Sequence, residues 1–236
     1  MTQQTSNIDE PSEKRKRFVL QIIFYVVGLV VTAFGIAFAI NSRLGITPVT
    51  SFPYAISVVS GIRIGTCVTI FLIFCIFIQF ILLRKEFKLI ELTQIIVATA
   101  FGFFVDFAIF VLGDFGIPTY AGQLTMLAIS IVIVSFGLVM YLDAKLVLMP
   151  VEGLTTVIAQ KLSTSFHRVK IVLDCIFVLL SITITFAFLN EIYGVREGTV
   201  ISAIVIGKLL PYCRALINMI LRKIKLYNLL NPEQMS

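Results

Sequence analysis

Residues 40–52, INSRLGITPVTSF, separate two long apolar runs with an amide, a basic residue, a glycine and a proline. A similar stretch, LDAKLVLMPVEGL, occupies residues 142–154. The two stretches align without a gap at an offset of 102 residues, which places Asp143 on Asn41, Lys145 on Arg43 and Pro150 on Pro48. The shared order of amide or acid, base and proline indicates an internal repeat. We call the two stretches the first motif and the second motif.

The repeat divides a membrane domain, 18–225, into a first half, 18–121, and a second half, 122–225. Each half holds three apolar segments long enough to span a membrane and, directly after its motif, one segment that is too short. Because each half crosses an odd number of times, the second half is predicted to be inserted upside down relative to the first, as in many secondary transporters. A chance similarity between apolar helices is the alternative that stays open.

Composition indicates an integral membrane protein. Of 236 residues, 58% are hydrophobic and 14% are charged, and the mean hydropathy is +1.02, which exceeds the apolar share of soluble domains. The apolar runs that are long enough to cross a hydrocarbon core of roughly 30 Å as helices are 18–40, 66–83, 92–112, 122–142, 171–189 and 199–221. We predict an all-α, polytopic fold with six transmembrane helices, a disordered tail over 1–17 and a second tail over 226–236.

The 19 basic residues indicate the orientation. If the amino terminus is cytoplasmic, most of them lie on the cytoplasmic side, including the run 14–17 and the basic residues at 84–88, 161–170 and 222–225. Basic residues are concentrated in cytoplasmic loops. We therefore expect both termini in the cytoplasm, and the net charge of +6 requires no nucleic-acid partner.

A short helix is predicted to begin at the proline of each motif, over 48–60 and 150–163. Proline suits the first position of a helix, and Thr47 is a natural N-cap before Pro48. In the second motif Glu152 occupies the first turn, where a carboxylate complements the helix dipole. Two such helices, half-inserted or re-entrant from opposite faces, would bring two helix N-termini toward the middle of the membrane.

The candidate substrate-binding residues are the polar residues of the motifs and the charges within the apolar runs. Asp106 and Lys208 interrupt two of these runs, and they are expected to pair if the third helices of the two halves meet. Intramembrane charges are costly and mark functional sites. The full set is Asn41, Arg43, Thr47, Pro48, Asp106, Asp143, Lys145, Pro150, Glu152 and Lys208. The structural alternative is that these residues are helix-end or interfacial groups whose polar ends reach the headgroups.

Small residues within the apolar runs are predicted to lie where helices pack closely, because glycine lets membrane helices approach one another. These are Gly28, Gly35, Gly102, Gly137 and Gly207.

The motifs of enzymes and of metal sites are missing from the sequence. It has no catalytic triad, zinc-protease signature, phosphate loop or dinucleotide turn, and its four cysteines form no CxxC pair beside a single histidine. We expect no enzyme activity, no cofactor and no metal. The expected partners are the lipid bilayer and an unidentified small solute, and a second copy of the chain is an open alternative.

With the motif FG(x)5-N/D-x-R/K-L-(x)3-P present twice and six apolar segments, the chain resembles the YitT/YczE-type family of bacterial integral membrane proteins. The stretch FGIAFAINSRLGITPVTSFPYAIS is most similar to the YczE branch. The resemblance implies a helical fold in a bacterial cytoplasmic membrane. It implies no substrate and no catalytic residues, because the family is largely uncharacterised.

Three functions fit the sequence. Inverted repeats with two proline-led short helices favour a small-solute transporter with its site between the halves. The substrate-binding subunit of an ATP-driven importer also has this size and helix number. The third alternative is a membrane scaffold or regulator that transports nothing.

Overall fold

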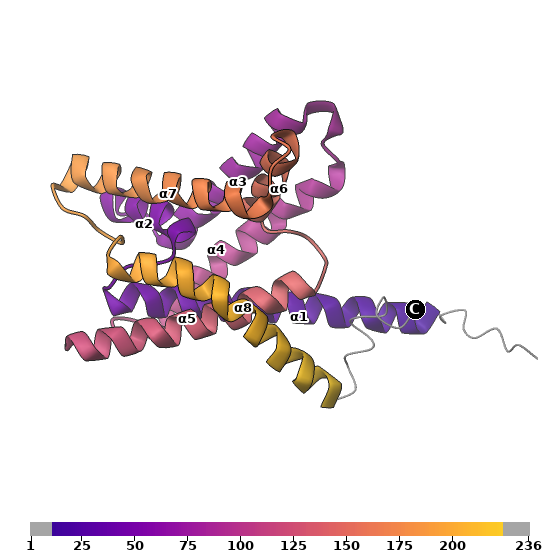
Figure 1. The fold of residues 1–236 in the computed structure, drawn as a ribbon, viewed down its shortest axis with the longest axis horizontal. Helices are drawn as coiled ribbons and strands as arrows, with labels where there is room; N and C mark the ends of the chain where they lie inside the picture. Colours follow the sequence, from indigo (N-terminus) through magenta and orange to yellow (C-terminus); the bar gives the residue numbers. More distant parts are fainter. Residues whose placement is uncertain (1–10, 224–236) are drawn as a thin grey trace, which may run out of the picture.

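The computed structural model describes residues 11–223, and every regular element in that part of the chain is a helix (Figure 1). The all-α class is therefore confirmed. The α-helices are α1 (Pro11–Ser42), α2 (Pro48–Ser60), α3 (Ile64–Leu83), α4 (Thr93–Leu112), α5 (Tyr120–Asp143), α6 (Pro150–Lys161), α7 (Phe166–Leu189) and α8 (Glu197–Lys223). Two short 3-10 helices, η1 (Arg84–Glu86) and η2 (Leu89–Leu92), connect α3 to α4.

Six helices, α1, α3, α4, α5, α7 and α8, are long and apolar enough to span a membrane. They match the six predicted segments, so the chain is a multi-pass membrane protein. The short helices α2 and α6 begin at Pro48 and Pro150, as predicted.

Two helices, α1 and α7, begin well before the apolar runs predicted from the sequence. Residues 11–17, which we assigned to a disordered tail, are the first turns of α1, and α7 begins at Phe166 rather than at residue 171. Both extensions carry lysine and arginine, which are good helix formers and are favoured at membrane interfaces. Residues 1–10 and 224–236, which include most of the two predicted tails, lie outside the described residues.

α1 and α5 pack along each other, and they run side by side in the lower part of Figure 1. A Cβ on Gly28 would lie 2.7 Å from the backbone nitrogen of Tyr141, and a Cβ on Gly137 would lie 2.3 Å from the hydroxyl of Thr32. Only glycine allows this approach. Four of the predicted interface glycines are confirmed by such contacts, but Gly207 has open space around it on α8, so its assignment to an interface is wrong.

The other helices pack in a pattern that is largely the same in both halves. α4 packs on α1, and α8 packs on α5. The short helices pack across the two halves. α2 of the first half contacts α7 of the second, and α6 of the second half contacts α3 of the first. One pair departs from the pattern: α3 and α4 pack closely where Gly65 meets Gly102, whereas α7 and α8 hardly touch.

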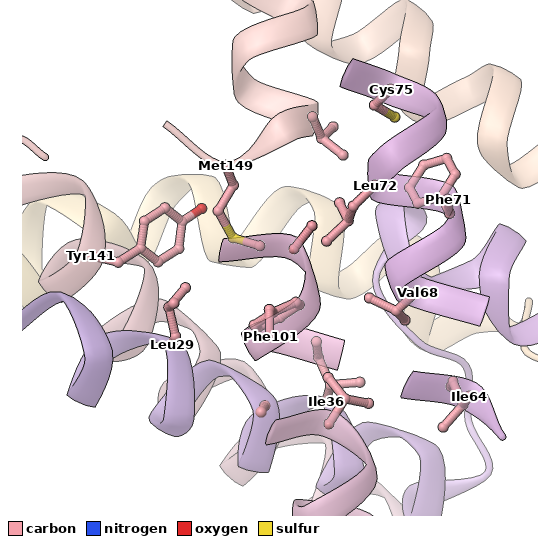
Figure 2. Packing of buried hydrophobic residues seen from close by; sticks show 14 of the residues in the cluster. Leu29, Ile36, Ile64, Val68, Phe71, Leu72, Cys75, Phe101, Tyr141 and Met149 are labelled. Atoms are coloured by element: carbon pink, nitrogen blue, oxygen red, sulfur yellow. The ribbon is translucent and has the colours of Figure 1, made fainter. Parts of the chain in front are cut away.

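The two short helices lie toward different ends of the bundle. In Figure 1, α2 lies at the left, where α1 and α7 end, and α6 lies toward the right, near the end of α3. The segment before α6 reaches the core, where Met149 lies among Tyr141, Phe101 and Leu72 (Figure 2). Large apolar side chains such as Phe110, which is 84% exposed, cover the lateral surface, as expected for helices in contact with lipid.

Candidate functional site

Both motifs follow the same backbone path. Arg43 and Lys145 adopt the left-handed conformation, with φ of 57° and 51°, which is uncommon for residues other than glycine. Thr47 and Met149 are extended, with ψ of 147° and 150°, and a proline then begins each short helix. The aligned positions therefore share a conformation as well as a residue type.

The first motif is hydrogen-bonded to the connection between α7 and α8. The carbonyl of Leu44 accepts from the backbone N–H of Gly198 at 2.8 Å, and the N–H of Ile46 donates to the carbonyl of Gly194 at 3.0 Å. The guanidinium of Arg196 donates to the carbonyl of the motif's basic residue at 3.1 Å. These bonds close the first motif against the second half of the chain.

Two polar side chains of the first motif have local partners. The hydroxyl of Thr47 does not cap α2, because it bonds to the hydroxyl of Thr50 at 2.8 Å instead. The amide of Asn41 donates to the carbonyl of Gly113 at 2.9 Å, which joins the end of α1 to the end of α4. Asn41 therefore has the helix-end role that the sequence left open, while the half-buried Thr47 and the buried Thr50 form a polar pair at the start of α2.

The second motif lines a pocket of about 270 Å³. Tyr141, Leu142 and residues 145–148 form its wall. Tyr25 of α1 donates its hydroxyl hydrogen to the carbonyl of Val147 at 3.0 Å, which fixes one side of the motif. The second motif therefore borders an open pocket at its end of the bundle.

Two buried amides hold the start of α6. The Nε2 of Gln79 donates to the carbonyl of Pro150 at 3.0 Å and to the Oε1 of Gln94 at 3.1 Å. A Cβ on Gly153 would lie 2.7 Å from the Oε1 of Gln79 and 3.1 Å from the Nε2 of Gln94, so a larger residue at this position would displace the two amides. These two glutamines were not among the predicted site residues, although each is an amide inside an apolar run.

Glu152 lies beside a second polar cluster. The hydroxyl of Tyr141 donates to its Oε1 at 3.1 Å. Burial raises the pKa of the Glu152 carboxyl, and the positive charge of Lys170 acts in the opposite direction. Lys170 forms an ion pair with Asp174 one turn further along α7. The sequence analysis missed Tyr141 and Lys170 as partners because they come from helices distant in the chain.

Three candidates lie apart from the short-helix N-termini. Asp143 forms a bidentate pair with Arg214 of α8, whose Nε lies 3.0 Å from both carboxylate oxygens. Asp106 accepts from the N–H of Gly65 at 2.7 Å and so caps the start of α3. Lys208 is exposed on α8 and does not pair with Asp106, so that suggested ion pair is not formed.

Most candidates therefore form two groups, while Asp106 and Lys208 belong to neither. Thr47, Pro48, Arg43 and Asn41 lie at the first motif; Lys145, Pro150 and Glu152 lie at the second, and Asp143 links that end of α5 to α8.

Known proteins support the membrane assignment. A family described as a family of unknown function, DUF6198, matches residues 19–215. The uncharacterized membrane protein YczE of Bacillus subtilis (strain 168) is 26% identical over 199 residues, covering 84% of this chain and 87% of YczE. The uncharacterized protein YyaS of the same organism is 25% identical over 140 residues, covering 59% of this chain and 68% of YyaS. No solved structure gives a significant match. The resemblance to YczE is confirmed.

Proposed function

This chain belongs to the DUF6198 family, whose function is unknown, and we propose from the geometry of its two motifs that it transports a small polar solute across the membrane. The observation that carries the proposal is the matching pair of proline-led short helices, which start from the same backbone conformation and lie toward different ends of the bundle. Irregular backbone at membrane depth is tolerated where protein buries it or where it lines a cavity.

The helix packing supports an inverted repeat. The packing of α2 on α7 has its counterpart in the packing of α6 on α3, and the packing of α4 on α1 has its counterpart in that of α8 on α5. Equivalent helix contacts in both halves are expected when two similar halves are related by a two-fold axis in the membrane plane. The basic residues favour cytoplasmic termini, and the similarity to a bacterial membrane protein supports a bacterial cytoplasmic membrane.

The differences between the halves support one state of an alternating-access cycle. The first motif is closed by hydrogen bonds to the α7–α8 connection, whereas the second motif lines a pocket. The halves also differ in helix packing, because α3 packs closely on α4 while α7 and α8 hardly touch. Rocking of one half against the other would close the second motif and open the first. We assign the open state in this structure to the cytoplasmic side, where the second motif would lie.

Uptake into proteoliposomes tests the proposal. Purified protein is given labelled amino acids, small carboxylates and sugars, and at least one is expected to accumulate above the level in empty liposomes. Thr47→Val should lower that uptake by about tenfold, because losing one hydrogen bond to the solute costs about 1.4 kcal/mol. Thr99→Val is the matched control, since the Thr99 hydroxyl is exposed and bonds only within α4.

Two outcomes would contradict the proposal. One is uptake equal to that of empty liposomes for every solute tested. The other is uptake only in the presence of a co-purifying ATP-hydrolysing partner, which would instead favour the substrate-binding subunit of an importer.

A further inference from the structure

A cluster of titratable groups lies where α6 meets α5 and α7. Glu152 comes from the first turn of α6, Tyr141 from α5, and Lys170 and Asp174 from α7. Each has a direct contact or a charge interaction with another member of the cluster. Four groups from three helices thus meet at the second motif, and Tyr141 is also part of the pocket wall.

The cluster has one negative charge too many when all its acids are ionised. Lys170 supplies one positive charge, which pairs with Asp174. Glu152 is then left with neutral hydrogen-bond donors, the hydroxyl of Tyr141 and its own backbone N–H. A partly buried carboxylate without its own counter-ion is unfavourable, and one added proton would make the cluster neutral.

The other elements packed around Glu152 bring no compensating cation. Tyr25 of α1 lies edge-on against Tyr141, with ring centroids 6.2 Å apart, and donates its own hydrogen to the carbonyl of Val147. Cys75 of α3 is buried nearby as a free thiol. These neighbours are all neutral, so Lys170 is the only positive charge that acts on Glu152 in the part of the chain that the structure describes.

We infer that Glu152 is a proton-binding site, reached from the pocket at the second motif, and that its proton is the coupling ion of the transport proposed above, on which this coupling role rests. When Glu152 is neutral, Lys170 pairs with Asp174 inside α7. When Glu152 is ionised, its carboxylate competes for Lys170 and draws α6 toward α7. The proton thereby controls the contact between α6 and α7.

The chemistry of the site favours a proton over a metal cation. Tyr141 directs its hydrogen at the carboxylate and so acts as a donor, whereas a hard cation needs about six oxygen ligands with free lone pairs. Lys170 beside the carboxylate would repel a cation. Burial raises the pKa of Glu152, which favours the protonated carboxyl.

Infrared difference spectroscopy of the purified full-length chain in lipid tests the site without any solute. As the pH rises, the carbonyl band of the protonated carboxyl should disappear with a midpoint above about 4.3, the ordinary value for glutamate. Glu152→Gln should remove the part of this carbonyl band that comes from Glu152. Glu86→Gln is the matched control, because Glu86 is an exposed acid paired with Lys161, and it should leave the Glu152 component unchanged.

Two further variants give shifts of opposite sign. Lys170→Met removes the positive charge and should raise the midpoint by roughly one pH unit or more. Asp174→Asn removes a negative charge and leaves Lys170 to Glu152, so it should lower the midpoint. An unchanged spectrum in Glu152→Gln, or shifts in the same direction in the other two variants, would overturn the inference.

The stability of the folded protein should also depend on the protonation of Glu152. A carboxyl whose pKa is raised in the folded protein stabilises it while protonated, and this contribution is lost as the pH rises through that pKa. The thermal midpoint of the wild type should therefore fall over that range, and Glu152→Gln should flatten the fall.

A flux measurement separates the coupling from the transport. If the carboxyl titrates as expected but no solute is taken up, the proton site is supported and the transport function is overturned. If a solute is taken up at a rate that neither a pH gradient nor Glu152→Gln changes, the transport function is supported and the coupling role of Glu152 is overturned.

Discussion

Gly137→Val should prevent α1 and α5 from packing. A Cβ at this position would lie 2.3 Å from the hydroxyl and 2.6 Å from the backbone nitrogen of Thr32, and 2.8 Å from the carbonyl of Gly28. Because two of these three atoms are backbone, the clash cannot be relieved by a side-chain rotation. Overpacking of this kind costs about 1 to 3 kcal/mol, and the affected contact is the extensive one between α1 and α5.

Thermal unfolding of the detergent-purified protein, followed by size-exclusion chromatography, measures this effect. Gly207→Val is the matched control, since Gly207 is also a helical glycine but has open space around it. The control should elute and unfold like the wild type, whereas Gly137→Val should aggregate or unfold at a much lower temperature. Equal stability of the two variants would contradict the α1–α5 contact described here.

Asp106→Leu, which replaces the single charged residue of α4, should destabilise the protein. Its carboxylate accepts the N–H of Gly65 in the first turn of α3, where no residue of α3 itself caps the helix by a side-chain hydrogen bond. Leucine would leave that N–H without its acceptor in an apolar setting. The expected loss is about 1 to 3 kcal/mol.

Asp106→Asn separates the structural role from a functional one. Asparagine keeps an acceptor oxygen, so it should retain most of the thermal stability that leucine loses. If asparagine instead keeps the fold but abolishes solute uptake, the negative charge itself is required, and the capping role would be an incomplete account of Asp106.

The spanning helices and the two short helices were predictable because their signals are local. An apolar run has a length that the membrane thickness sets, and a proline fixes the first residue of a helix, as at Pro48 and Pro150. The starts of α1 and α7 were less predictable, because lysine and arginine are compatible with both a polar tail and a helix end.

The partners of the site residues were not predictable from one sequence. Gln79 and Gln94 meet the start of α6 only through the fold, and Tyr141 reaches Glu152 from the last turn of α5. The assignment of Gly207 to an interface failed for the same reason, since glycine in an apolar run does not reveal which face of its helix is covered. Pairings of this kind depend on which helix faces are adjacent, and a single sequence carries little information about that.

The central claim is that the two motifs lie at opposite faces of the membrane, and cysteine accessibility tests it most directly. Arg43→Cys and Lys145→Cys are made in a background without Cys67, Cys75, Cys175 and Cys213. Both positions are exposed and both already have a positive φ, so they are matched in environment and backbone. With a membrane-impermeant maleimide, the two cysteines should be labelled from opposite sides of sealed membranes. Labelling of both from the same side would contradict the inverted repeat.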